Sequence, residues 1–203
     1  MNDLVIRLET DKDYDKVESV TREAFWNVYR PGCLEHFVLH RYRSRAEFIA
    51  ELSLIAEKDG QIVGHVMYSQ AELLCDNGNV LPIATFGPLS ILPTEQGKGY
   101  GSALLTYSIG KARELGFKAI AITGNYDFYK RFGFVIGKEK GILYADDPTA
   151  DYFLIKELQP RALDGISATY KDPEGYFVDD KQAEEFDAAF PRKEKATNAN
   201  QIF

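Results

Sequence analysis

The sequence is poor in cysteine and histidine and has no long hydrophobic run. Among its 203 residues there are two cysteines, Cys33 and Cys75, and three histidines. The two cysteines lie far apart and form no CxxC unit, which argues against a disulfide framework and a zinc ribbon. No apolar stretch reaches about 18 residues, and the N-terminus lacks the basic start and apolar core of a secretion signal. We therefore expect a cytoplasmic protein with reduced thiols and no membrane partner.

Net positive charge is also missing. The chain has 24 lysines and arginines against 31 aspartates and glutamates, a net charge of −7. This balance argues against general nucleic-acid binding, so we expect no nucleic-acid partner. The hydrophobic fraction of 45% is ordinary for a soluble domain with one core. Because the chain turns polar after Gln159, we predict a domain over residues 1–159 and a C-terminal extension over residues 160–203, which packs on it and ends in a partly flexible tail.

Changes in hydrophobic period divide the chain into strands and helices. Residues 14–26 show helical spacing, as do residues 101–115, and Gly116 predicts the end of the second helix. Asp59-Gly60 and Asn77-Gly78 separate β-rich segments and predict two hairpins, hence three consecutive antiparallel strands. These patterns predict an α+β fold in which helices pack against a mostly antiparallel sheet.

Three glycines fall within five positions of the segment LPTEQGKGYGSALL, residues 92–105, between a predicted strand and a predicted helix. The first turn of a helix has unpaired N–H groups and about half a positive charge. Gly97, Gly99 and Gly101 would let a phosphate approach these groups without a Cβ in the way. Their spacing matches neither the dinucleotide motif nor the nucleoside-triphosphate loop. A plain turn before a helix is the alternative.

The surrounding residues resemble a known family. The segment QGKGYG, Gln96–Gly101, matches the Q/R-x-x-G-x-G/A signature of the GCN5-related N-acetyltransferase (GNAT) superfamily. Further on, YKRFGF, Tyr129–Phe134, resembles the short family helix that ends in Y-x-x-x-G-F. The segments ELSLIAEKDGQIVGH and FYKRFGF are most similar to the YhbS-like branch. The resemblance, from Leu4 to about Leu158, implies a GNAT (acyl-CoA N-acyltransferase) fold, with a mixed, mostly antiparallel sheet flanked by helices and a short C-terminal extension.

The resemblance also implies a cosubstrate, acetyl-CoA, and the residues that hold it. The glycine loop would bind the pyrophosphate, and backbone groups of Leu89 and Ile91 would hydrogen-bond the pantetheine arm as an added strand does. Asn125 either caps the following helix or faces the pantetheine. The loop residues implied in pyrophosphate binding are Gln96, Gly97, Lys98, Gly99, Tyr100, Gly101 and Ser102.

Acetyl transfer to an amine needs a proton donor for the thiolate and an acceptor for the amine proton. Tyr129 matches the family tyrosine that serves the thiolate, with Tyr126 as the neighbouring alternative and a core aromatic as the plain structural interpretation. Many family members have a glutamate eleven positions before the motif glutamine, where this chain has Thr85. Candidate bases are therefore Glu51, with Glu35 and His65 as alternatives; a core histidine is the plainer interpretation of His65.

The segment NVYRPGCLEHFVLHRYRSR lies where substrates of the family enter, between the first two helices. We expect Cys33, Glu35 and His36 to form a wall of the acceptor pocket. A metal site there lacks a clear fourth ligand, so none is predicted. Three arginines follow, which would bind a carboxylated acceptor or the 3′-phosphate of the cofactor, or form a solvated face: Arg41, Arg43 and Arg45.

Taken together, the sequence predicts an enzyme. We expect an acetyl-CoA-dependent N-acetyltransferase that acetylates a primary amine, of a small molecule rather than a large protein, by direct attack in a ternary complex. Two alternatives stay open: a non-catalytic acyl-CoA-binding sensor, favoured by Thr85, and an N-acyltransferase that uses a different acyl-CoA. The sequence is compatible with a homodimer but does not decide the oligomeric state.

Overall fold

The computed structural model describes residues 4–198 and residue 201. Residues 1–3 of the predicted domain, and residues 199–200 and 202–203 of the predicted extension, lie outside the described residues. The boundary at residue 159 stays a prediction. The helices of the described chain are α1 (Tyr14–Phe25), α2 (Glu35–Tyr42), α3 (Tyr100–Glu114), α4 (Tyr126–Tyr129) and α5 (Asp180–Asp187). The strands are β1 (Leu4–Leu8), β2 (Leu54–Lys58), β3 (Gln61–Cys75), β4 (Val80–Ile91), β5 (Ala119–Thr123), β6 (Val135–Ile136), β7 (Ile142–Tyr144), β8 (Phe153–Glu157) and β9 (Ala168–Tyr170).

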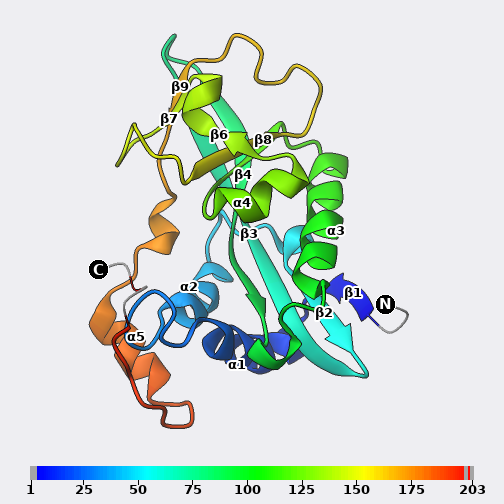
Figure 1. Cartoon of the computed structure of the whole chain (residues 1–203), viewed down its shortest axis with the longest axis vertical. Coiled ribbons are helices and arrows are strands. Elements are labelled where there is room, and N and C mark those ends of the chain that lie inside the picture. The colour runs from blue at the N-terminus through cyan, green and yellow to red at the C-terminus, as the bar shows by residue number, and fades with distance from the viewer. Residues whose placement is uncertain (1–3, 199–200, 202–203) are drawn as a thin grey trace. The chain divides into compact units, whose positions relative to one another are not determined.

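The strands form an open, mixed sheet flanked by helices (Figure 1). Among the described residues the hydrogen-bonded order is β1-β2-β3-β4-β5-β8-β6, and β9 pairs with both β3 and β7. The β4–β5 and β7–β9 pairs are parallel, whereas β1–β2, β2–β3, β3–β9, β5–β8 and β6–β8 are antiparallel. The α+β class and the mostly antiparallel sheet expected from the sequence are confirmed.

The chain divides into two compact units, and β3, β4 and α3 contribute residues to both. The first unit comprises the described residues within Met1–Met67, Pro88–Leu105 and Glu174–Phe203. Its core packs α1 and α2 on the β2–β3 hairpin, with Val17, Leu39 and Ile55 fully buried. The second unit comprises Tyr68–Gly87 and Thr106–Pro173, and its core is rich in aromatic and small side chains, including Phe153, Tyr170, Ala119 and Ala121.

The β2–β3 hairpin turns where the sequence predicts. Asp59 and Gly60 both adopt positive φ angles, 51° and 74°, as a two-residue turn between right-twisted strands requires. Gly116 has a φ of 87° just beyond α3 and ends that helix as expected. By contrast, β7 and β9 were not predicted. Each has three residues, too few to show an alternating pattern.

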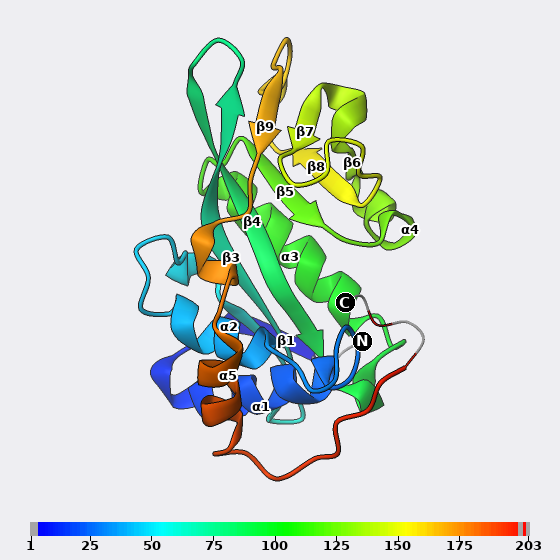
Figure 2. The same cartoon turned by 90° about the vertical axis from the view of Figure 1, so that its left-hand side faces the viewer.

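The end of the chain packs within the first unit, on α1 and α2. Helix α5 has an acidic sequence, and Asp179 caps it by accepting a hydrogen bond from the Gln182 N–H. Arg22 of α1 forms two contacts with Asp187 of α5, at 2.6 Å and 3.0 Å, and the Arg22 side chain is almost wholly buried. Figure 2 shows α5 beside α1 and α2, with the following segment, in red, running along α1.

Candidate functional site

The glycine loop between β4 and α3 has the backbone conformation that its sequence suggests. Gly97 and Gly99 have φ angles of 75° and 88°, a region that side chains disfavour. No protein atom lies within 4 Å of the position that a Cβ on either residue would take. Gly101 differs, because it lies inside the first turn of α3 and a Cβ there would be 3.4 Å from Ile91 Cγ1. Gly97 and Gly99 therefore form an open backbone surface, whereas a Cβ at Gly101 would make an ordinary van der Waals contact with Ile91.

The start of α3 presents N–H groups at this surface. The Ala103 N–H donates to the Gly99 carbonyl at 3.0 Å, and this is the first hydrogen bond of the helical pattern. The N–H groups of the three helical residues before Ala103 therefore have no acceptor inside the helix. Gln96 braces the loop from the other side, because its Nε2 donates to the Ile91 carbonyl at 3.0 Å. Such a helix start favours an anion through both its free donors and its dipole.

Two lysines flank the loop, and only one of them was predicted. Lys98 Nζ lies 3.1 Å from one oxygen of Glu95, and Lys58 Nζ lies 3.6 Å from the other. The hydrogen bond from Lys98, followed by the charges of both lysines, lowers the pKa of Glu95. Lys58 also approaches the ring of Tyr100, at 5.8 Å from its centroid. Lys58 belongs to β2, and no local sequence signal connects that strand with the loop.

Leu89 and Ile91 have the orientation that the predicted pantetheine contacts need. The Leu92 N–H donates to Val63 of β3 at 2.8 Å. Because successive residues of a strand direct their backbone groups to opposite sides, those of Leu89 and Ile91 point away from β3. Within the second unit, the β4–β5 ladder pairs Ala84 and Thr85 and then ends, although both strands continue. The pairing of β4 with β5 therefore ends before Gly87 and Pro88, neither of which is well suited to a central strand.

Tyr129 ends the four-residue helix α4 and is held among aromatic rings. Its ring centroid lies 5.9 Å from that of Phe86 and 5.7 Å from that of Phe134. A Cβ on Gly124 would lie 2.6 Å from Tyr129 Cε2, so the glycine makes room for this ring. Asn125 caps α4, since its Oδ1 accepts from the Phe128 N–H at 3.2 Å.

Tyr126 and Asn125, the other two residues of interest at α4, have different contacts from Tyr129. Tyr126 lies under Lys130, whose Nζ is 5.7 Å from its ring centroid, and it has none of the ring contacts that hold Tyr129. The capping hydrogen bond matches one of the two roles predicted for Asn125. A contact from Asn125 to a cofactor stays a prediction.

The three candidate bases have different surroundings. Glu51 is exposed on a short 3-10 helix and, among the described residues, makes no hydrogen bond or ion pair. Glu35 is half-buried at the start of α2, where one oxygen accepts from the Leu34 N–H at 2.9 Å, and burial raises its pKa. His65 is fully buried. Of the two carboxylates, Glu35 therefore has the environment that strengthens a base.

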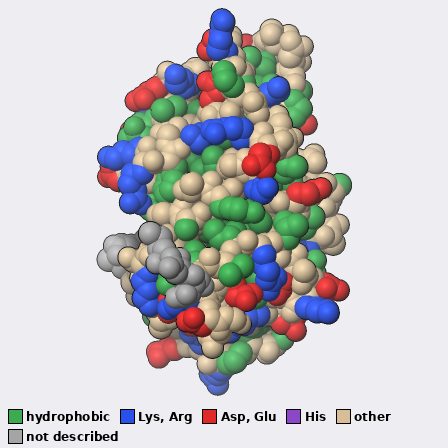
Figure 3. Space-filling view, turned by 90° about the vertical axis from the view of Figure 1, so that its right-hand side faces the viewer, with side chains coloured by type: hydrophobic (Ala, Val, Ile, Leu, Met, Phe, Trp, Pro, Cys, Tyr) green, Lys and Arg blue, Asp and Glu red, His purple; other side chains and the backbone are tan. Residues whose placement is uncertain are grey.

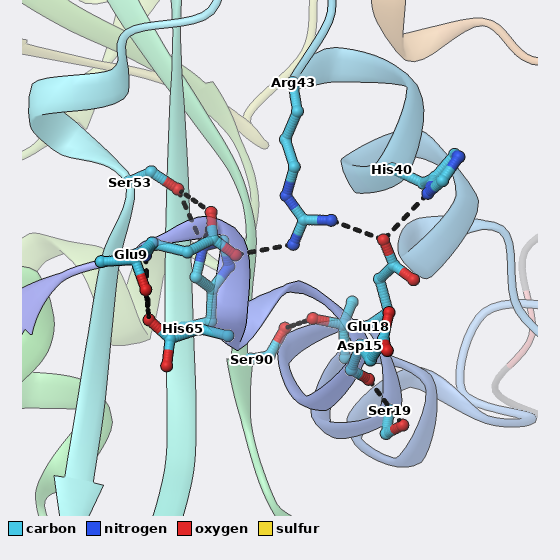
Figure 4. Close-up of polar contacts among 12 residues, drawn as sticks. Glu9, Asp15, Glu18, Ser19, His40, Arg43, Ser53, His65 and Ser90 are labelled. Carbon is cyan, nitrogen blue, oxygen red and sulfur yellow. Dashed lines mark hydrogen bonds and ion pairs between the residues drawn. The ribbon is translucent and has the colours of Figure 1, made fainter.

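His65 belongs to a buried polar cluster that joins β1, β2 and β3 to α1 and α2 (Figure 4). Its Nε2 lies 3.1 Å from Ser53 Oγ, and the Ser53 hydroxyl donates to Glu9 at 2.6 Å. Burial opposes ionisation of Glu9, but the interactions with His65 and Arg43 outweigh it and lower the Glu9 pKa to about 2. Arg43 bridges Glu9 and Glu18. This arrangement confirms the plainer interpretation of His65 as a core histidine with a partner.

Cys33 and His36 lie side by side, but their surroundings keep both side chains neutral. Cys33 Sγ is 3.2 Å from His36 Nδ1, and His36 Nε2 is 3.0 Å from Asp187 Oδ1. Burial raises the pKa of Cys33 to about 12 and lowers that of His36 to about 4. A protonated thiol is a poor nucleophile. The contact between His36 and Asp187 fastens α5 to α2. Glu35 is not part of this contact.

The three arginines at the end of α2 and directly after it are engaged within the first unit. Arg41 donates to Gln182 of α5 at 2.9 Å, and Arg45 pairs with Glu47 at 3.0 Å. Arg43 is buried between two glutamates and stacks on Tyr14, 3.9 Å from its ring centroid. Arg43 therefore belongs neither to a ligand-binding patch nor to a solvated face.

The described residues include neither a cluster of metal ligands nor a helix suited to crossing a membrane. Within residues 4–198 and residue 201, no three His, Cys, Asp or Glu side chains are grouped so that they could hold a metal ion. None of the helices in this part of the chain has both the length and the apolar character needed to span a membrane.

Comparisons with known proteins agree with the geometry of the loop. The profile of the acetyltransferase (GNAT) family matches residues 20–134. An uncharacterized N-acetyltransferase of Escherichia coli K12, YhbS, is 24% identical over 165 residues, which cover 81% of this chain and 93% of YhbS. A second Escherichia coli K12 protein, the uncharacterized N-acetyltransferase YjhQ, is 31% identical over 83 residues, 41% of this chain and 45% of YjhQ.

Solved structures share the fold. The crystal structure of Escherichia coli YhbS in complex with CoA has a TM-score of 0.75 at 23% identity, over 86% of this chain and 92% of that one. A GNAT acetyltransferase of Brucella melitensis in complex with acetyl-CoA has a TM-score of 0.69 at 25% identity, over 86% of this chain and 98% of that one. These matches confirm the fold that the sequence motifs imply.

Proposed function

The chain belongs to the acetyltransferase (GNAT) family, and from this premise we propose that it transfers the acetyl group of acetyl-CoA to a primary amine of a small molecule, by direct attack in a ternary complex. The observation that carries the proposal is the open backbone surface of Gly97 and Gly99 at the start of α3. It presents N–H donors and a helix dipole to an anion and has no side chain that would obstruct the approach of a phosphate.

The residues of the loop fit the pyrophosphate of coenzyme A. The N–H groups from Gly97 to Ser102 would bind its oxygens, and the two lysines beside Glu95 would neutralise its charge. The backbone groups of Leu89 and the N–H of Ile91, which point away from β3, would align the pantetheine arm. The Ile91 carbonyl accepts from Gln96 Nε2. When bound, acetyl-CoA supplies the acetyl group and the thiolate that departs. Complexes of the related structures with CoA and acetyl-CoA support this assignment.

Two residues of the chain would handle the protons. Tyr129, whose ring is fixed by Phe86 and Phe134, would donate its phenolic proton to the departing thiolate. Glu35 would accept the amine proton, because its raised pKa brings it closer to the operating pH than an exposed carboxylate. Glu51 stays an alternative base that would work from solvent. The transfer would be direct, without a covalent acyl-enzyme intermediate. Cys33, the buried cysteine of the first unit, would not act as a nucleophile because its raised pKa keeps the thiol protonated.

Charge supports a small cationic acceptor. The chain is acidic, with a net charge of −7. The arginines that would have attracted an anionic acceptor are engaged with Glu9, Glu18, Glu47 and Gln182. On the face shown in Figure 3, basic and acidic side chains are interspersed and no large patch of one sign forms. An extended polyanionic partner would find no complementary surface on that face.

The test is turnover with a panel of amines. Purified protein is mixed with acetyl-CoA and with polyamines, amino-sugars, amino acids and a lysine peptide, and free thiol release is measured together with calorimetric binding of CoA. We expect binding and thiol release for at least one small amine, with intersecting initial-rate patterns in which both substrates bind before product leaves. Parallel patterns would contradict the ternary complex. Propionyl-CoA and longer acyl-CoA in place of acetyl-CoA test the acyl preference.

Thr85 favours a second candidate, an acyl-CoA sensor without catalysis. It is buried and 3% exposed, at the position where many relatives of the family have a glutamate. Strand β4 contains no Asp or Glu that could take the place of that glutamate. Tight CoA binding without thiol release above background for every amine would support the sensor over the enzyme.

A further inference from the structure

A pocket lies in the first unit between the end of α1 and the segment that follows α5. Its volume is about 640 Å³, within the usual range for small-molecule sites. None of the residues predicted to bind the cofactor or the acceptor lines it. Its walls include Trp26, Asp187, Phe190, Arg192, Lys193 and Lys195.

The walls of this pocket are fixed by hydrogen bonds. Trp26 Nε1 donates to the Glu194 carbonyl at 2.9 Å, and the Ala196 N–H donates to Asn27 Oδ1 at 3.0 Å. Asn27 itself adopts a φ of 59°, unusual for a residue other than glycine, and its carbonyl accepts from Asn198 Nδ2 at 2.7 Å. The segment after α5 is thus tied to the end of α1 at several points. A pocket held in this way is already formed before a ligand arrives.

Most charges of the lining are already paired within the protein. Lys193 pairs with Glu23 at 2.7 Å, and Lys195 pairs with Glu184 at 2.9 Å. Asp187 is satisfied by Arg22 and His36, so its charge is compensated inside the protein. Of the charged lining residues, Arg192 and Glu194 then have no ion-pair partner among the described residues, and Arg192 is the cation of the two.

Arg192 is the cation that a ligand can use. Its side chain is exposed, and among the residues that the structure describes it makes no ion pair. A guanidinium presents paired N–H donors that match the two oxygens of a carboxylate or phosphate. The lining therefore includes a cation whose donors are not committed to a neighbouring acid.

Aromatic surface accompanies the charge. Trp26 and Phe190 both line the pocket, and the Arg22 guanidinium lies 4.2 Å and 5.4 Å from their ring centroids. Lys193 Nζ lies 5.5 Å from the Trp26 ring. Aromatic rings in a pocket can pack against a flat apolar group in an offset or edge-to-face arrangement.

We propose that this pocket binds a small organic anion, with a flat apolar body against the rings and a carboxylate or phosphate at Arg192. The proposal stands whether or not the chain transfers acetyl groups. Such an anion has two sources: the phosphorylated adenosine end of the cofactor, or a separate metabolite with an acidic group. Both have the same chemistry and differ in whether the cofactor competes for the pocket.

The chain provides its own reporter for the test. Trp26 is the only tryptophan, so intrinsic fluorescence reports on this pocket directly. The probe is phenyl phosphate, compared with phenol and with inorganic phosphate, each of which has half of the proposed features. We expect a saturable fluorescence change with phenyl phosphate, at a dissociation constant about tenfold or more below that of either half. No saturable change, or equal affinity for inorganic phosphate alone, would overturn the proposal.

A charge variant and a matched control test the position of the anion. Arg192→Gln should raise the dissociation constant for phenyl phosphate about fivefold or more without lowering the melting temperature. The control is Arg161→Gln in the second unit, at an arginine whose side chain is 86% exposed and pairs with Asp164. It should leave binding unchanged, and equal affinities of the two variants would contradict the assignment. Competition by acetyl-CoA identifies its adenosine phosphates as the natural anion, and absence of competition identifies a separate metabolite.

Discussion

A methyl group on Gly99 tests the loop most directly. Its φ of 88° lies in the left-handed region, and the space where a Cβ would project contains no protein atom within 4 Å. Gly116, just beyond α3, has a φ of 87° and the same open surroundings. Both residues are exposed. Alanine at either position therefore imposes the same backbone strain, but only the Gly99 methyl would lie on the surface proposed to hold phosphate.

The two substitutions are expected to agree in stability and to differ in binding. Left-handed alanine costs about 1 kcal/mol, which lowers the melting temperature of a chain of this size by about 2–4 °C. A methyl group that moves the phosphate away from one N–H donor removes a hydrogen bond to a charged group, worth about 1.5–3 kcal/mol. Gly99→Ala should therefore weaken CoA binding by about tenfold to a hundredfold, and Gly116→Ala should leave it unchanged.

The assay is isothermal titration of each variant with CoA, together with thermal unfolding. If Gly99→Ala and Gly116→Ala unfold at similar temperatures and only the first loses affinity, the loss belongs to the loop surface and not to the fold. The reasoning is refuted if Gly99→Ala binds CoA as tightly as the unsubstituted protein. It is also refuted if both variants lose affinity equally, because strain alone would then explain the effect.

Three further perturbations address other parts of the molecule. Tyr129→Phe should lower turnover about a hundredfold and leave CoA affinity unchanged, because the ring packing stays and only the proton donor is lost; steady-state rates and calorimetry separate the two. Glu95→Gln should tighten CoA binding about threefold at low salt, because the carboxylate competes with phosphate for Lys98 and Lys58; equal or weaker binding at low ionic strength would contradict this. His36, with a pKa lowered by burial to about 4, stays neutral in the folded state while the unfolded chain binds a proton. The free energy of unfolding should therefore fall by about 3 kcal/mol as the pH drops from about 6.5 to about 4, and denaturant titrations of His36→Asn should lack this slope.

The features that the sequence predicted well depend on short stretches of chain. The loop from Gln96 to Gly101 reveals both its conformation and its chemistry within six residues, since positive φ angles and helix starts have local signatures. The turn at Asp59 and the end of α3 at Gly116 are local in the same sense. For such elements the backbone preferences of single residues decide the structure, and tertiary contacts do not override them.

The features that were missed depend on residues far apart in the chain. Arg22 and Asp187 are separated by 165 positions, and neither has a neighbour that signals the pairing. Arg43 was grouped with its neighbours as a surface charge, although it is the buried partner of Glu9 and Glu18. The sequence shows that a side chain is charged, but it does not show whether a distant residue of opposite charge will pack against it in the folded protein. Lys58 escaped notice for the same reason.

Asn27 has a consequence for exchanging segments between relatives. Its Oδ1 accepts hydrogen bonds from Gly32 of the α1–α2 connection and from Ala196 of the C-terminal segment. One amide oxygen thus serves two stretches that lie far apart in the sequence. A chimera with a different α1–α2 connection but the original C-terminal segment would lose this shared acceptor if Asn27 were replaced. The N–H group of Ala196 would then lack its hydrogen-bond partner. We expect grafts of both stretches together to fold where single grafts fail.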